Sequence, residues 1–168
     1  PPGFGPALAR GKAPQVAVSL DGSMPLRGEL ARAYVSGVHA QTLAEAAAFA
    51  RELAARENLV FVHPYDDPAV VAGQGTVALE MLSEAPDLDF LVAPVGGGGL
   101  SAGCAVGAAG LGGRTKVVGV EVESYAAMAQ KLAGHAVCVG GPTIAEGIAV
   151  RDVGALPEAI LRACGVEV

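Results

Sequence analysis

The chain has 168 residues, 52% hydrophobic and 17% charged, so it is long enough and apolar enough to bury the core of a globular domain. Its formal net charge of −6 offers no basic surface for nucleic acid or anionic lipid, which favours small-molecule chemistry. The three cysteines form no C-x-x-C pair and the three histidines lack metal-ligand spacing, so neither a disulfide framework nor a metal site is expected, and a reducing cytoplasm is the expected compartment.

The first part of the chain predicts little regular structure before a single helix. Residues 1–26 are rich in proline and glycine and predict no defined element. Thr42–Glu45 has the pattern of a capping box, and apolar residues at spacings of three and four predict a helix from there to about Arg56. The apolar run Leu59–Val62 predicts a short buried strand.

A proline-containing loop, His63–Pro68, leads into the next predicted helix, over residues 68–84. Asp67 is placed to cap that helix, with proline as its first residue. Gly73 and Gly75 lie in its interior, where each costs about 1 kcal/mol relative to alanine. We therefore expect a neighbouring backbone to approach the helix closely at these glycines.

The middle of the chain predicts a βαβ unit. Residues 89–93 and 116–121 have the pattern of strands and residues 100–111 that of a helix, so the two strands are expected to be parallel. Both strands are almost continuously apolar, which predicts a sheet covered on both faces.

The uncharged stretch 90–113 is not expected to span a membrane, because a proline and four consecutive glycines interrupt it. The small residues of the helix predict close packing on the sheet.

The end of the chain predicts two more helices. Ser124 is expected to cap the first, which ends before Gly134. Thr143–Glu146 fits either a second capping box or a short turn. The second helix covers residues 156–163, and residues 166–168 begin a strand.

Four consecutive glycines, Gly96 to Gly99, stand between the first strand of the βαβ unit and its helix. A strand that enters such a turn exposes backbone N–H groups at a helix N-terminus, where free donors and the helix dipole favour an anion such as phosphate. A flexible linker, or a tight turn that binds nothing, is the alternative. A dinucleotide is one candidate ligand, because Gly97-x-Gly99-x-x-Ala102 fits a permissive nucleotide-binding pattern and Glu121 ends the following strand.

The second candidate ligand, pyridoxal 5′-phosphate, is indicated by a resemblance. Five blocks of the chain resemble, in the same order, blocks of the fold-type II pyridoxal-phosphate enzymes of the threonine dehydratase and serine racemase branch. The blocks are His63–Pro68, Ala72–Glu80, Val95–Leu100, Gly119–Glu121 and Thr143–Val150.

The resemblance implies a fold and a reaction. The expected fold is a three-layer αβα arrangement with a mostly parallel open sheet, like tryptophan synthase β, here incomplete. Residues 1–26 are then an uninterpretable leader, 27–66 the end of a small α/β domain, and 67–168 part of a large cofactor-binding domain. The expected parent enzyme is a cytoplasmic homo-oligomer, a lyase that eliminates water from L-threonine or L-serine to give a 2-oxo acid and ammonia. Dehydratase and racemase activity are not distinguished.

The resemblance also implies the site residues. The phosphate is expected on the amides of Gly96, Gly97, Gly98, Gly99 and Leu100. Glu146 and Gly147 are expected beside the cofactor ring, although the first of them can equally belong to a capping box. Asp67 is expected on the substrate side of the cleft, although its role can equally be that of a helix cap alone. Some relatives bind a divalent cation near the equivalent of Glu121, but Ala127 replaces the required acid, so no metal site is predicted.

Enzymes of this branch hold the cofactor as a Schiff base on a lysine, and Lys12, Lys116 and Lys131 are all that this chain offers. None is convincing as that lysine, and no catalytic residue is predicted here. The chain is therefore expected to be an internal fragment that binds the cofactor weakly and catalyses nothing alone. A fragment of an NAD-dependent oxidoreductase and a non-catalytic phosphate- or effector-binding module are the alternatives.

Overall fold

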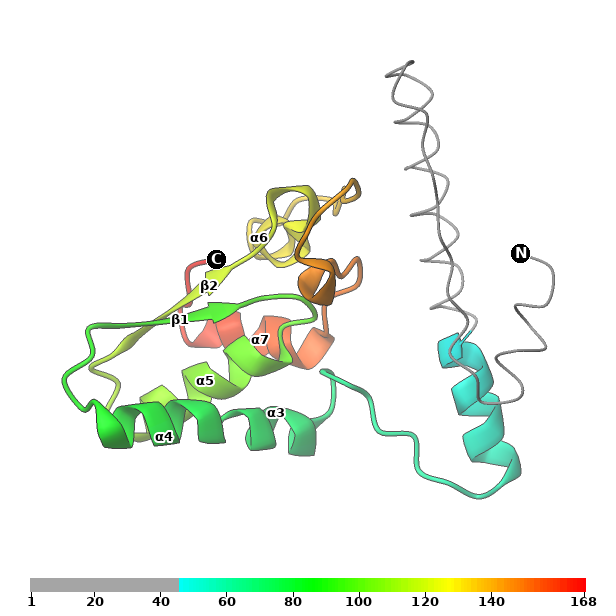
Figure 1. Cartoon of the computed structure of the whole chain (residues 1–168), viewed down its shortest axis with the longest axis horizontal. Coiled ribbons are helices and arrows are strands. Elements are labelled where there is room, and N and C mark those ends of the chain that lie inside the picture. The colour runs from blue at the N-terminus through cyan, green and yellow to red at the C-terminus, as the bar shows by residue number, and fades with distance from the viewer. Residues whose placement is uncertain (1–45) are drawn as a thin grey trace, which may run out of the picture.

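The computed structural model describes residues 46–168 (Figure 1). Residues 46–56 are helical, which confirms the predicted helix end near Arg56, whereas the predicted capping box Thr42–Glu45 lies outside the described residues. The predicted strand Leu59–Val62 is wrong: the segment has no strand geometry, and Val60 is 88% exposed. Within residues 46–168 no neighbouring strand pairs with this segment, and an apolar run without a hydrogen-bonding partner does not form a sheet.

The helix predicted over 68–84 is two consecutive helices, α3 (Pro68–Gln74) and α4 (Thr76–Glu84), with Gly75 between them. A Cβ at Gly75 would lie 2.9 Å from the carbonyl oxygen of Gly103, so the expected close approach of a neighbouring backbone is confirmed there. The same expectation is wrong for Gly73, where a Cβ would meet open space.

The βαβ unit is confirmed. It consists of β1 (Phe90–Pro94), α5 (Gly99–Gly110) and β2 (Lys116–Val120), and the two strands are parallel, with Phe90 opposite Lys116. The start of a third strand is also confirmed, because Glu167 forms a parallel bridge with Val118 on the free edge of β2.

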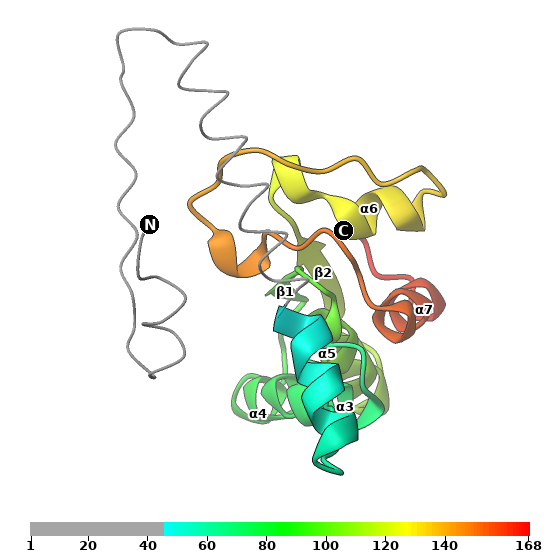
Figure 2. The same ribbon diagram turned by 90° about the vertical axis from the view of Figure 1, so that its right-hand side faces the viewer.

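The sheet is covered on one face only by the described residues. In Figure 2, as in Figure 1, α3, α4 and α5 lie on the same side of the two strands. Burial therefore alternates along β1: Leu91 and Ala93 are in the core, while Phe90 and Val92 are 57% and 62% exposed. The expectation of a sheet covered on both faces is not met within residues 46–168.

Small residues let α5 pack closely against α3 and α4, and the helix also contacts both strands of the sheet. A Cβ at Gly103 would collide with the carbonyl oxygen of Val71 and lie 2.6 Å from the nitrogen of Gly75, and one at Gly107 would lie 2.9 Å from the oxygen of Gly75. The predicted packing of the helix on the sheet is confirmed, but these two glycines face the junction of α3 and α4 instead.

The remaining elements are η1 (Glu123–Tyr125), α6 (Ala127–Leu132), η2 (Glu146–Ile148) and α7 (Ala155–Ala163). Of the two structures predicted for Thr143–Glu146, the short turn is confirmed. The hydroxyl of Thr143 accepts a hydrogen bond from the N–H of Ala145 (3.0 Å), two residues later, whereas a capping box needs the N–H three residues later. Helix α7 packs against α5 and α6 and contributes Leu161, which is fully buried. None of the helices in the described part of the chain is long and apolar enough to cross a membrane.

Helix α6 is capped from outside its own segment, and the predicted cap at Ser124 is wrong. The carboxylate of Glu121, at the end of β2, accepts hydrogen bonds from the N–H groups of Met128 (2.8 Å) and Ala129 (2.9 Å). Negative charge at a helix N-terminus is favourable because the free N–H groups and the helix dipole both attract it. Gly134 follows the helix with φ of +75°, as the predicted helix end requires.

We expect Glu121→Ala to lower the free energy of unfolding by about 1 kcal/mol, the usual cost of removing a helix cap. Chemical unfolding followed by circular dichroism measures the change. Glu123→Ala is the matched control, because Glu123 lies two residues away and forms no hydrogen bond or ion pair with the described residues. If the two substitutions lowered the free energy of unfolding equally, the capping role of Glu121 would be contradicted.

Candidate cofactor-binding site

The candidate site is built on the glycine loop, Gly96–Gly99, which turns the chain from β1 into α5. Gly97, Gly98 and Gly99 are buried. Gly98 is the residue that precedes α5, and its φ of +93° is a conformation that side chains with a Cβ rarely adopt. The loop therefore requires glycine at this position for its backbone path.

The N–H groups of the glycine loop have no partner in the described structure. The carbonyl of Gly98 accepts from Ala102, the first bond of α5, and from the hydroxyl of Ser101 (3.0 Å). By contrast, among residues 46–168 no acceptor contacts the N–H groups of residues 96–101. N–H groups without a protein partner at a helix N-terminus are available to an anion, so this row fits an anionic ligand.

The glycine loop is packed against segments of the protein that are distant in sequence. A Cβ at Gly97 would overlap the ring of Tyr65, and one at Gly98 would lie 2.8 Å from Cβ of Pro157. At Gly96 it would lie 3.2 Å from Cα of Ile148. The residues present thus fit a phosphate: the loop is a backbone cradle with no room for side chains.

Asp67 is the N-cap of α3. Its Oδ1 atom accepts hydrogen bonds from the N–H groups of Ala69 (2.8 Å) and Val70 (3.1 Å), which confirms the predicted cap. A position on the substrate side of a cleft stays a prediction for this residue.

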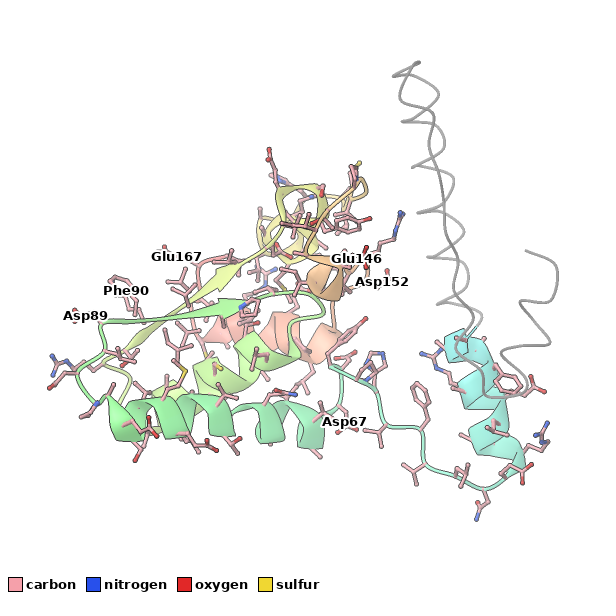
Figure 3. The ribbon with its side chains drawn as sticks, viewed as in Figure 1. Asp67, Asp89, Phe90, Glu146, Asp152 and Glu167 are labelled. Atoms are coloured by element: carbon pink, nitrogen blue, oxygen red, sulfur yellow. The ribbon has the colours of Figure 1, made fainter. Side chains whose placement is uncertain are left out.

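Glu146 and Gly147 lie in η2, which reaches the glycine loop through its third residue, because Ile148 packs against Gly96. Both are exposed, and a Cβ at Gly147 would meet no atom within 4 Å. Figure 3 shows Glu146 and Asp152 on the same side of the molecule, with Asp67 below them. Their role beside a cofactor ring stays a prediction.

Two residues of the site were missed from the sequence. Asp66 accepts a hydrogen bond from the N–H of Leu156 at the start of α7 (2.9 Å), and Tyr65 donates its hydroxyl to the carbonyl of Asp152 (2.7 Å). These contacts span about ninety residues, and no local pattern announces them. Burial raises the pKa of the Tyr65 phenol, and the charges of Asp152 and Asp66 raise it further, so the hydroxyl stays a donor.

The lysines of the described chain lie away from the glycine loop. Lys116 is exposed at the start of β2, opposite Phe90, whereas Gly96 follows the end of β1, about 20 Å farther along the parallel strand. Lys131 points toward Glu158, with 3.5 Å between Nζ and Oε2. Lys12 lies outside residues 46–168.

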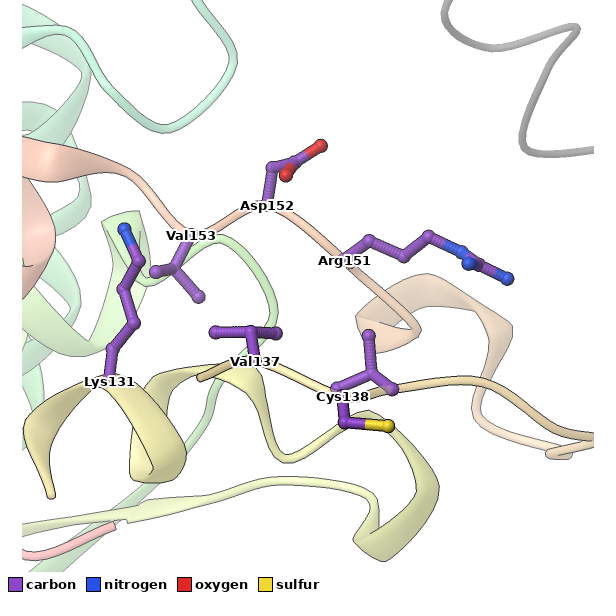
Figure 4. A pocket seen from close by; sticks show the side chains of 7 residues that line it. Lys131, Val137, Cys138, Arg151, Asp152 and Val153 are labelled. Carbon is purple, nitrogen blue, oxygen red and sulfur yellow. The ribbon is translucent and has the colours of Figure 1, made fainter. Parts of the chain in front are cut away.

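A separate pocket of about 470 Å³ lies elsewhere in the described chain (Figure 4). Residues from the end of α6, from 137–139 and from 151–153 line it, and none of the predicted site residues does. No group of three or more His, Cys, Asp or Glu side chains gathers to hold a metal ion in the described residues. Glu121, the acid considered for a ribose or a metal, uses its carboxylate to cap α6.

Relatives with known names share most of this chain but are much longer. An L-threonine ammonia-lyase of Thermotoga maritima is 46% identical over 103 residues, which cover 60% of this chain and 26% of the relative. A biosynthetic L-threonine dehydratase of Salmonella typhimurium is 44% identical over 119 residues, covering 70% and 23%. The chain thus spans about a quarter of the length of these curated relatives.

Solved structures share its fold. Threonine deaminase isoform 2 of Solanum lycopersicum matches with a TM-score of 0.62 and 37% identity, over 66% of this chain and 33% of that one. Serine racemase of Dictyostelium discoideum matches with a TM-score of 0.61 and 32% identity, over 69% and 37%. These matches confirm the αβα fold of the fold-type II enzymes, present here in part.

A family model described as "Pyridoxal-phosphate dependent enzyme" matches residues 9–168, nearly the whole chain. This match favours pyridoxal phosphate over a dinucleotide as the ligand of the glycine loop, and it agrees with the row of unpaired N–H groups found there. This chain belongs to the family of pyridoxal-phosphate-dependent enzymes.

Proposed function

We propose that this chain forms the phosphate-binding part of a threonine or serine dehydratase that depends on pyridoxal phosphate. The observation that carries the proposal is the row of N–H groups in the glycine loop with no partner among residues 46–168. Such groups stabilise a bound dianion strongly, because hydrogen bonds to charged acceptors are about twice as strong as neutral ones.

In this proposal the amides of Gly96 to Leu100 hold the phosphate group. Glu146 and Gly147 border the cofactor ring, because η2 packs on the same loop. Asp67 stands on the substrate side while it caps α3. When bound, pyridoxal phosphate supplies the electron sink for the elimination, and the protein supplies binding, orientation and proton transfer.

The proposed reaction removes water from L-threonine or L-serine and releases a 2-oxo acid and ammonia. The names of the relatives, at 44% and 46% identity, support this substrate class. The proposed setting is a homo-oligomer in the cytoplasm, supported by the resemblance and by three cysteines that are all free. The small domain, in this proposal, ends near residue 66, and residues 67–168 belong to the large domain.

We expect the 168-residue chain to bind pyridoxal phosphate saturably, and pyridoxal, which lacks the phosphate, about tenfold or more weakly. Isothermal titration calorimetry measures both affinities. Saturable binding of NAD instead would overturn the choice of cofactor. Equal affinity for inorganic phosphate and pyridoxal phosphate would indicate a phosphate-binding module rather than a cofactor site.

The control for this titration is borohydride reduction followed by peptide mapping. We expect no stoichiometric adduct on Lys116 or Lys131. Lys116 stands opposite Phe90, about 20 Å from Gly96 along the strand, and Lys131 is turned to Glu158. We also expect no 2-oxobutanoate from L-threonine with this chain alone. A stoichiometric lysine adduct, or turnover by this chain, would contradict its role as a phosphate-binding part only. The native protein that carries this sequence is expected to form 2-oxobutanoate, and its failure to do so would overturn the proposed activity.

A further inference from the structure

Tyr65 contacts three segments that meet at the glycine loop. Its ring lies directly on Gly97, because a Cβ there would overlap three ring atoms, and its Cα lies 3.0 Å from where a Cβ of Gly99 would stand. Its hydroxyl donates to the carbonyl oxygen of Asp152 at 2.7 Å. One side chain thus links the 63–67 segment, the glycine loop and the 152–154 segment.

The ring of Tyr65 also contacts a second aromatic side chain, that of His63. The imidazole of His63 meets it edge-on, with 4.6 Å between ring centroids and an angle of 86°. Nδ1 of His63 accepts a hydrogen bond from the N–H of Asp66 (3.0 Å), which fixes the imidazole. The phenol ring is therefore in contact with both His63 and Gly97.

The same segments fix the orientation of the peptide groups in the glycine loop. The carbonyl of Gly97 accepts from the N–H of Gly154 at 3.0 Å. Because a trans peptide is planar, a C=O fixed toward Gly154 turns the N–H of Gly98 in the opposite direction. The position of the 152–154 segment, which Tyr65 holds through its hydroxyl, thus sets the direction of a free N–H group of the cradle.

We propose that Tyr65 is a positioning residue of the phosphate site. It acts through Gly97 and the 152–154 segment, and it keeps the N–H groups of the glycine loop oriented before a ligand arrives. Pre-organised donors bind more tightly because the ligand does not have to order them. The proposal rests on the proposed function, since it requires a phosphate-bearing ligand at this loop.

The first test compares ligand affinity in variants of the full 168-residue chain. We expect Tyr65→Phe, which keeps the ring and loses the hydrogen bond to Asp152, to bind pyridoxal phosphate about threefold more weakly. We expect Tyr65→Ala, which loses the ring as well, to bind about tenfold or more weakly. Amide chemical shifts of Gly97, Gly98 and Gly99 during a titration with inorganic phosphate give a second readout.

Leu82→Ala is the control for a purely structural effect. Leu82 is buried on α4 in a cluster with Leu91, and it is not among the residues that pack on the glycine loop. We expect this variant to unfold more easily but to bind pyridoxal phosphate with unchanged affinity while folded. If Tyr65→Ala also lowers stability and leaves affinity unchanged, the positioning role is overturned.

A double-mutant cycle tests the contact between the ring and the loop. Gly97→Ala adds a methyl group where the ring stands, so we expect a large loss of stability in the wild-type background and a much smaller additional loss in Tyr65→Ala. Additive effects would overturn the inferred contact. If the wild-type chain binds neither pyridoxal phosphate nor inorganic phosphate, the proposed function is overturned. The positioning role then falls with it, even if the double-mutant cycle shows that the ring and the loop are in contact.

Discussion

Gly103→Ala is expected to lower the free energy of unfolding by about 3 kcal/mol, at the upper end of the cost of overpacking a core. The added methyl group would stand 2.6 Å from the nitrogen of Gly75 and collide with the carbonyl oxygen of Val71. Both obstacles are backbone atoms, so no side-chain rotation can relieve them. Helix α5 would have to move away from α3 and α4, and the apolar contacts along that interface would weaken.

Gly110→Ala is the matched control, since it places the same substitution in the same helix. A Cβ at Gly110 would meet nothing within 4 Å, so we expect a gain of about 0.5–1 kcal/mol from the better helix propensity of alanine. Urea unfolding followed at 222 nm gives both values. If both substitutions changed the free energy of unfolding in the same direction, α5 would not approach α3 and α4 as closely as described.

Gly98→Ala is expected to cost about 3 kcal/mol and to abolish saturable binding of pyridoxal phosphate. Two effects add: an L-residue at φ of +93° costs about 1–2 kcal/mol, and the methyl group would lie 2.8 Å from Cβ of Pro157. The methyl of Met128 is also close, at 2.6 Å, but a flexible side chain can turn aside. Relief of the contact with Pro157 would displace the N–H groups at the start of α5.

Gly134→Ala separates the two effects. Gly134 also has positive φ, +75°, but a Cβ there would meet open space, so only the conformational cost of about 1 kcal/mol is expected, with unchanged affinity for pyridoxal phosphate. Unfolding curves and calorimetric titrations of both variants make the comparison. Equal stability and equal affinity of the two variants would contradict the described packing of the loop.

Local signals in the sequence predicted the features that depend on local chemistry. The βαβ unit follows from two apolar runs and the helix between them, and the cap at Asp67 follows from an acid before a proline. The glycine loop was predicted for the same reason: four residues without a Cβ fit only a sharp turn or a close approach of neighbours. Here the structure has both, since Gly98 has positive φ and Gly97 meets the ring of Tyr65.

The errors concern contacts between residues far apart in the sequence. Ser124 has the residue type of a cap, but Glu121 is closer to the N–H groups of α6 once β2 has placed it there. The run at Leu59–Val62 has the composition of a strand, but a strand also needs a hydrogen-bonding neighbour, and composition does not supply one. Asp66 and Asp67 are adjacent and chemically alike, yet only the second caps the helix that follows it; the first reaches α7, ninety residues later.

The hydrogen bond between Asp66 and Leu156 has a consequence for how the protein folds. It closes a long stretch of chain, and the bond between Tyr65 and Asp152 closes nearly the same stretch. The entropy of closing so large a loop must be overcome before either contact can form, so contacts of this kind form late in folding. The βαβ unit, whose contacts are more local, can form first, and the cradle acquires its final shape only when the 152–156 segment reaches it. If the loop binds a phosphate as proposed, ligand binding and the completion of folding are therefore expected to be coupled at this site.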